Sequence, residues 1–159
     1  SQDTLQVKVQ QVLSGNSFLT DKNLEVKLIG INTPPKDDSL KISELSLSTG
    51  INSDTIKLLG SLCAEFTENY LKGEKVFLVR DINDIGADSS GKISCYVYLE
   101  DGSLFNKTIL LYGYAFADPE QKNSFREWKD FSAIMLYIRS YYLGLWINPN
   151  FRKLQPELF

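Results

Sequence analysis

The chain has 159 residues, 43% of them hydrophobic, so it is long enough to bury a core within one domain. Its 17 lysines and arginines are outnumbered by 20 acidic residues, and the net charge of −3 excludes a general attraction to polyanions. It contains no histidine, which excludes histidine-ligated zinc, catalytic triads that use histidine and a histidine general base.

The N-terminal part of the chain predicts three adjacent strands. Residues 5–13 alternate between apolar and polar side chains, residues 17–20 form a second strand, and residues 24–31 form a third, with polar turns between them. Pro34 and Pro35 end this region, because proline cannot donate to a strand ladder. Residues 36–61 are polar with spaced leucines, and we expect part of this segment to pack or to form a short helix.

The remainder predicts two more strands and three helices. Helical spacing covers about residues 58–72, and Gly73 suits the position that follows a helix. Residues 76–79 and 93–99 predict the fourth and fifth strands. Residues 100–103 predict a hairpin turn that leads into residues 104–105. Residues 109–111 predict a short helix that closes at Gly113, and residues 125–142 predict an amphipathic helix that ends at Gly144.

Two features leave alternatives open. Cys63 and Cys95 fall at apolar positions and lack the spacing of a zinc site, so they are either two buried thiols or one disulfide. Residues 147–159 contain Pro149 and Pro156 and three apolar positions near the end, and they either wrap back onto the core or dock a partner. No run of about 18 apolar residues predicts a membrane-spanning helix.

Three blocks in the chain resemble the staphylococcal nuclease-like (thermonuclease) family. Residues 27–35 are similar to its motif R-L-x-G-I-D-T-P-E. Residues 101–115 are similar to D-G-x-x-V-N-x-x-L-V-x-x-G-x-A, and residues 133–146 to A-x-x-x-A-R followed by G-L-W. The resemblance covers about residues 5–146 and implies an α+β, mainly β fold, a five-stranded OB-type barrel with about three helices. One domain over residues 1–159 is expected, with 147–159 as an extension.

The resemblance also implies the chemistry of the site. Active members of the family hydrolyse phosphodiesters of DNA and RNA with one Ca²⁺ ion, held by two aspartates and a backbone carbonyl. At the matching positions, Asn16 and Asn32 replace the two aspartates, and Thr33 keeps only a carbonyl that any residue would offer. Asparagine retains an oxygen without its charge, so we expect no metal ion and no other cofactor.

The remaining catalytic positions have changed as well. The family's glutamate, its base or water-positioning group, is replaced by Pro35, which cannot accept a proton. The two arginines that clamp the phosphate are replaced by Lys27 and by Lys92, which follows the turn that contains Asp88. Lysine retains the charge but lacks the two-pronged fork of arginine. The resemblance therefore implies a nuclease homologue without an intact catalytic residue.

Two functions of different classes follow from these changes. The first is a non-catalytic domain, or pseudoenzyme, that binds a protein or single-stranded nucleic acid through the former cleft, with Lys27 and Lys92 as phosphate or ligand contacts. The second is a Ca²⁺-dependent phosphodiesterase or endonuclease with a rearranged site. Since many members of the family are exported, we expect secretion or a place in the cell envelope. For the binding function, four tyrosines could stack on bases: Tyr96, Tyr98, Tyr112 and Tyr114. For a rearranged catalytic site, four carboxylates could enter the cleft: Asp21, Glu25, Asp37 and Asp38.

Overall fold

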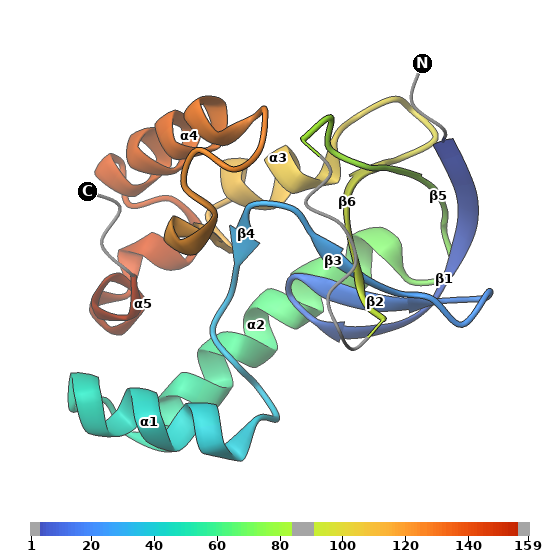
Figure 1. The fold of residues 1–159 in the computed structure, drawn as a ribbon. Coiled ribbons are helices and arrows are strands. Elements are labelled where there is room, and N and C mark those ends of the chain that lie inside the picture. Colours follow the sequence, from blue (N-terminus) through green and yellow to red (C-terminus); the bar gives the residue numbers. More distant parts are fainter. Residues whose placement is uncertain (1–3, 84–90, 156–159) are drawn as a thin grey trace.

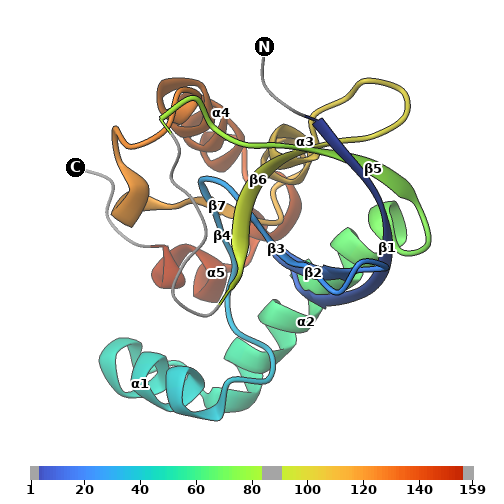
Figure 2. The ribbon, with the colours of Figure 1, turned by 45° about the vertical axis from the view of Figure 1, so that its right-hand side comes forward.

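Five strands close into a barrel in the computed structural model, which describes residues 4–83 and 91–155 (Figures 1 and 2). Each strand pairs antiparallel with its neighbours except where β3 runs parallel to β6. This mixed, closed barrel confirms the predicted OB-type architecture. In order around the barrel, the strands are β1 (Thr4–Ser14), β2 (Ser17–Thr20), β3 (Glu25–Leu28), β6 (Ile93–Tyr98) and β5 (Lys75–Val79).

The interior of the barrel is filled by alternate residues of these strands. Val7 and Val9 of β1 point inward while their neighbours are exposed, as the period of two in the sequence predicts. Cys95 of β6 lies in the same interior, whereas Cys63 belongs to a helix that packs beside the barrel. Both thiols are buried and free, so the first of the two interpretations is confirmed.

The third predicted strand is wrong in one respect, because it is broken in the middle. Strand β3 ends at Leu28, and β4 (Ile31–Asn32) pairs with β7 (Phe116–Ala117) in a separate two-stranded sheet. Gly30 sits at the break with a left-handed φ of 73°, and a Cβ there would lie 2.3 Å from the ring of Phe125. The sequence pattern does not reveal this turn, because Val26, Leu28, Ile29 and Ile31 on both sides of Gly30 are all apolar and buried.

Five α-helices surround the barrel, two more than the sequence predicts. Helix α2 packs against β1, beneath the barrel in Figure 1, while α3, α4 and α5 lie to one side. Helix α1 occupies the polar segment whose structure was left open, and α2 begins well before residue 58 because Asn52 caps it. The helices are α1 (Ser39–Thr49), α2 (Ser53–Leu71), α3 (Phe105–Leu111), α4 (Trp128–Ser140) and α5 (Pro149–Leu154), with short 3₁₀ turns η1 (Pro119–Gln121) and η2 (Gly144–Ile147).

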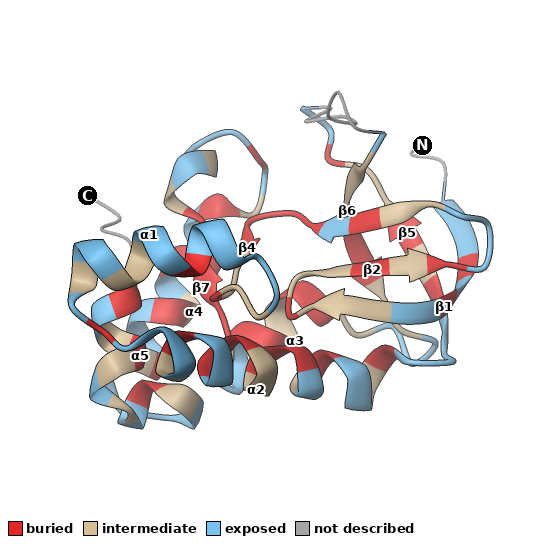
Figure 3. Ribbon diagram, turned by 90° about the horizontal axis from the view of Figure 1, so that it is seen from below, coloured by how far each residue is buried: buried red, intermediate tan, exposed pale blue. Residues whose placement is uncertain are grey.

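The segment after Trp146 packs back onto the core as far as the structure describes it. Phe151 of α5 is fully buried, and its ring lies 4.5 Å from that of Phe116 and 4.9 Å from that of Trp146, measured between centroids. Leu154 is also buried. Pro156 and the last apolar positions of the chain lie outside the described residues. Helix α1, in contrast to α5, has a largely exposed outer face (Figure 3).

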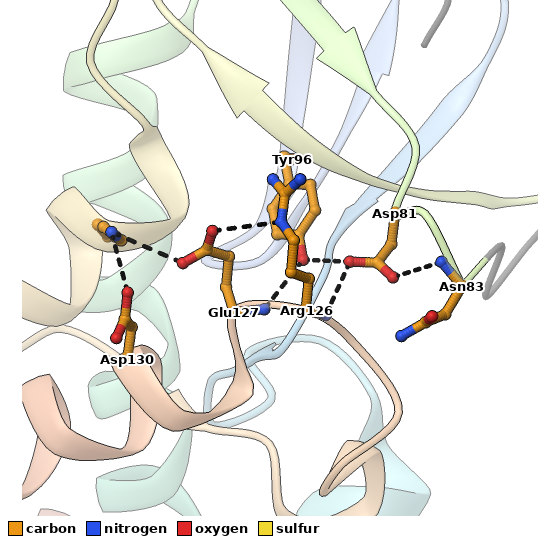
Figure 4. Close-up of polar contacts among 7 residues, drawn as sticks. Asp81, Asn83, Tyr96, Arg126, Glu127 and Asp130 are labelled. Carbon is orange, nitrogen blue, oxygen red and sulfur yellow. Dashed lines mark hydrogen bonds and ion pairs between the residues drawn. The ribbon is translucent and has the colours of Figure 1, made fainter. Parts of the chain in front are cut away.

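A buried polar network joins the barrel to α4 (Figure 4). The carboxylate of Asp81, just after β5, accepts a short hydrogen bond from the Tyr96 hydroxyl and further ones from the backbone N–H groups of Arg126 and Asn83. Burial opposes the charge, but these hydrogen bonds outweigh it and lower the pKa of Asp81 below its ordinary value. Burial is the main cause that raises the pKa of Tyr96, and the hydrogen bond to Asp81 and the negative charge of that carboxylate raise it further.

Candidate functional site: a groove at the barrel mouth

A groove of about 390 Å³ opens between the β1–β2 turn, strand β3, the start of β6 and the segment that precedes α1. It contains the matched positions 16, 27, 33, 35 and 92, so the structure brings together residues that the sequence spreads over 77 positions. Its lining residues are Leu13, Ser14, Asn16, Ser17, Glu25, Lys27, Thr33, Pro34, Pro35, Lys36, Asp37, Asp38, Lys41 and Lys92.

Asn16 uses both ends of its side-chain amide. Its Nδ2 donates to the backbone carbonyl of Ile31 at 3.0 Å, and its Oδ1 accepts from the hydroxyl of Ser14 at 2.8 Å. Ser14 in turn lies 2.6 Å from the hydroxyl of Ser17. The amide therefore links the β1–β2 turn directly to β4.

The other two positions of the metal site are arranged differently. Thr33 lines the groove, while Asn32 does not, although its backbone in β4 is fixed by pairing with Phe116 of β7. Asn32 is half-buried beside the groove. Only one of the two asparagines that replace the aspartates therefore faces the groove.

Pro35 forms part of the groove wall because it lies directly on helix α2. A Cβ added at Gly60 would lie 2.3 Å from the carbonyl oxygen of Pro35 and 2.8 Å from that of Pro34. Only glycine at this point of the helix allows so close an approach. The position that carries the family's glutamate is thus a backbone contact with α2, and it offers no side chain that could accept a proton.

Two of the four lysines in the groove form ion pairs with carboxylates of the same groove. Lys92 Nζ lies 3.0 Å from Glu25 Oε2, and Lys36 Nζ lies 3.3 Å from Asp37 Oδ2. Within residues 4–83 and 91–155, no ion pair includes Lys27 or Lys41. The positive charge available to a ligand is therefore concentrated at Lys27 and Lys41.

A buried carboxylate lies close to these two lysines. Asp118, between β7 and η1, is 8% exposed, and its Oδ1 accepts a hydrogen bond from the backbone N–H of Glu120. Burial raises the pKa of Asp118 above its ordinary value, while the Glu120 hydrogen bond and the charges of Lys27 and Lys41 act in the opposite direction. Asp118 is not predicted from the sequence, because only the turn after β7 brings it to the groove lysines.

Three of the four carboxylates considered for a rearranged site line the groove, but each is engaged in another contact. Asp38 caps helix α1 through a hydrogen bond from the Lys41 backbone N–H at 3.1 Å, and Glu25 and Asp37 are ion-paired as described. Asp21 lies outside the groove and accepts from the backbone N–H of Lys8. In the part of the chain that the structure describes, no three acidic or cysteine side chains gather where they could hold a metal ion. Asp88 lies outside the described residues.

These donors do not fit the calcium ion of the active family. Ca²⁺ takes several oxygen ligands, and carboxylates supply most of its attraction. Here the Asn16 amide nitrogen is turned to the carbonyl of Ile31 and its oxygen to Ser14, so the amide is already satisfied.

None of the four tyrosines considered as stacking platforms lines the groove. Tyr96 is buried in the network with Asp81, and Tyr98 is half-buried at the end of β6. Tyr112 and Tyr114 lie with Phe66, whose ring centroid is 5.6 Å and 4.7 Å from theirs. This aromatic cluster joins α2 to the region around α3. The tyrosines of β6 do not reach the groove, because the Tyr96 ring contacts Phe131 of α4 and helix α3 packs against the same strand.

The closed five-stranded barrel defines the chain as an OB-type barrel protein with a groove on one side of the barrel. A sequence model described as Staphylococcal nuclease homologue matches residues 25–148, and the chain belongs to this family. A comparison with curated proteins gave no match. Among residues 4–83 and 91–155, no helix has the length and apolar character needed to cross a membrane.

Proposed function

We propose that this chain is a non-catalytic member of the staphylococcal nuclease family, and that its groove binds a partner protein or single-stranded nucleic acid. The observation that carries the proposal is the amide of Asn16, which joins two backbone segments and leaves no anionic oxygen for a metal ion. The loss of a base at Pro35 supports it, since a missing general base lowers hydrolysis by about 10² to 10⁴-fold.

The charges in the groove favour a protein segment as the ligand. Lysines and carboxylates alternate along the wall, and Glu25 and Asp37 neutralise Lys92 and Lys36. A polyanion would meet these carboxylates, whereas an extended peptide with both kinds of charge would complement them. Single-stranded nucleic acid is the second candidate because Lys27 and Lys41 are outside the ion pairs of the described residues.

A nuclease assay on single-stranded DNA tests the loss of catalysis. The natural chain is compared with a revertant that carries Asn16→Asp, Lys27→Arg, Asn32→Asp, Pro35→Glu and Lys92→Arg, each in Ca²⁺, Mn²⁺, Mg²⁺ or chelator. We expect no cleavage by the natural chain and no rise in its melting temperature with Ca²⁺, since only a ligand that binds the folded state stabilises it. Chelator-sensitive cleavage by the natural chain, above background, would contradict the proposal.

The ligand class is tested by titrating a labelled chain with two probes, a mixed-charge peptide and an oligothymidylate. Resonances of Lys27, Thr33 and Lys41 should shift with the peptide, and Lys27→Glu should weaken its binding several-fold. Lys57→Glu, on an exposed part of α2, is the matched control. Shifts in the groove with oligothymidylate alone would favour the second candidate, and no shift in the groove with either probe would reject the site.

A further inference from the structure

The segment of residues 131–155 differs in charge from the rest of the chain. Residues 131–155 contain Arg139, Arg152 and Lys153 and no aspartate or glutamate, although the whole chain carries a net charge of −3. Local charge of one sign raises the local concentration of oppositely charged ligands even where the net charge does not. This segment is therefore the most cationic region of an acidic chain.

Large apolar and aromatic side chains are exposed in the same region. They come from the second half of α4, from the turn that follows it and from η2, and a cluster of such residues on a surface commonly marks a binding site. Tyr137 and Tyr141 lie one helical turn apart with their ring centroids 4.9 Å from each other. The exposed residues are Leu136, Tyr137, Tyr141, Tyr142, Leu143 and Ile147.

A hollow of about 380 Å³ lies within this surface, between α4 and α5. It is lined by Leu136, Arg139, Ser140, Tyr142 and Arg152, and it shares no residue with the groove at the barrel mouth. One hydroxyl and two guanidinium groups thus face a space that has an aliphatic and an aromatic wall. No carboxylate of residues 4–83 or 91–155 lines it.

Both arginines are held in place by contacts that leave their charge uncompensated. Arg152 donates from Nη1 to the carbonyl of Trp146 at 2.5 Å, and its guanidinium lies 4.7 Å from the centroid of the Tyr142 ring. Arg139 lies over the indole of Trp146 at 5.9 Å. Among the described residues, neither arginine takes part in an ion pair. Ordered guanidinium groups lose little freedom when they bind an oxyanion.

The backbone at Tyr142 is unusual in a way that fits a binding site. Its φ is 54°, in the left-handed region where an aromatic residue is rare and where glycine or asparagine normally follows a helix. This conformation places the ring of Tyr142 against Arg152. Residues with such strained backbone conformations are found preferentially at ligand sites.

We propose that the hollow between α4 and α5 binds a phosphate group of a nucleotide or short single-stranded polynucleotide. Arg139 and Arg152 are its anion contacts, because the planar fork of arginine matches two oxygens of a phosphate. The Ser140 hydroxyl donates to the backbone carbonyl of Tyr137 at 2.7 Å, so the two guanidinium groups are the donors for the anion. The exposed tyrosines next to the hollow offer faces on which bases stack. The proposal does not depend on the function of the groove, since the two sites share no residue.

The test is the binding of a fluorescein-labelled oligothymidylate of eight nucleotides, followed by anisotropy at several salt concentrations. We expect the Arg139→Gln, Arg152→Gln double variant to bind about tenfold more weakly and to lose about one unit of the slope of log K against log salt, as removal of a phosphate contact does. The Arg139→Lys, Arg152→Lys variant should bind several-fold more weakly than the natural chain, although its charge is unchanged.

Two matched variants separate the site from other causes. Lys57→Gln with Lys75→Gln removes the same charge from exposed positions elsewhere and should change affinity less than twofold. Lys27→Gln with Lys41→Gln removes the free cations of the groove and should also leave this binding nearly unchanged, which distinguishes it from the proposed groove function. Asparagine tolerates the left-handed backbone of position 142, so the Tyr142→Asn variant should fold. It should nevertheless bind the oligothymidylate less tightly than the natural chain.

Several results would overturn the proposal. They are undetectable binding of oligothymidylate to the natural chain, equal losses in the Arg139 and Arg152 variant and in the Lys57 and Lys75 control, or a loss only in the groove variant. Vesicles that contain phosphatidylserine serve as a parallel probe. Arginine-dependent binding to these vesicles without binding to oligothymidylate would assign the surface to lipid and reject the nucleotide.

Discussion

At the scale of single residues, Asn16 shows why an amide suits this turn. A carboxylate can accept hydrogen bonds but cannot donate one, whereas the amide of Asn16 donates to Ile31 and accepts from Ser14 at the same time.

Asn16→Asp should therefore destabilise the fold in the absence of metal. It places a carboxylate oxygen against the Ile31 carbonyl, and we expect the free energy of unfolding at neutral pH to fall by about 1–3 kcal/mol. Urea denaturation with chelator present measures this loss. Asn52→Asp is the matched control, because Asn52 uses only its oxygen, which accepts from Asp54, and its change should stay within about 0.5 kcal/mol. Equal effects of the two substitutions would contradict this account.

The sequence predicts part of the site at this scale, but not all of it. The motif positions Asn16, Lys27, Thr33, Pro35 and Lys92 gather in one groove, as their order in the resemblance implies. The sequence also indicates Asp37 and Asp38 as carboxylates near the former cleft, and both line the groove. Asp118 is not predicted, because it comes close to the groove lysines only through the path of the chain after β7, which the matched motifs do not cover.

At the scale of elements, the contact of Tyr96 with Asp81 ties β6 to the end of β5 and to the start of α4. The alternation of apolar residues finds each of these elements, but it does not find the carboxylate that joins them. The break between β3 and β4 is missed for a similar reason, since burial of both segments makes them one apolar run. Local sequence patterns predict the helices and strands themselves. The contacts that join them depend on the tertiary structure, so these patterns do not reveal them.

Tyr96→Phe should weaken the contact that joins β6 to the end of β5 and the start of α4. It should also make the free energy of unfolding less sensitive to a fall in pH. The pKa of Asp81 is lowered in the folded state, so its contribution is complete above the unfolded pKa and disappears as the pH falls through the folded one. Without the Tyr96 hydroxyl, we expect a loss of about 1.5–3 kcal/mol at pH 7, which shrinks as the pH falls. Unfolding curves at several pH values measure both effects.

Tyr98→Phe provides the comparison for this experiment. Tyr98 lies on the same strand, and its hydroxyl makes no hydrogen bond with the residues that the structure describes. Its removal should change stability by less than about 0.5 kcal/mol at any pH. A parallel loss in both variants would mean that the packing of β6, rather than the Asp81 carboxylate, is responsible.

At the scale of the whole molecule, the hydrophobic core continues beyond the motifs of the family into α5. Phe151→Ala should lower the free energy of unfolding by about 3–5 kcal/mol, because it removes a fully buried ring stacked on Phe116. Ile147→Ala, at a position 71% exposed, should change it by no more than about 0.5 kcal/mol. Urea denaturation of the two variants measures the difference. A small effect at Phe151 would mean that α5 is dispensable to the core.

The parallel pairing of β3 with β6 also governs when the barrel can form. Val26 pairs with Ile93 and Leu28 with Cys95, so both helices α1 and α2 and strand β5 lie in the loop that this contact closes. Closing so long a loop is slow, because its entropy is lost before the contact is gained. During synthesis, β3 has an unpaired edge until β6 leaves the ribosome. The nascent protein therefore passes through a period in which the barrel is incomplete and its apolar interior is accessible to other chains.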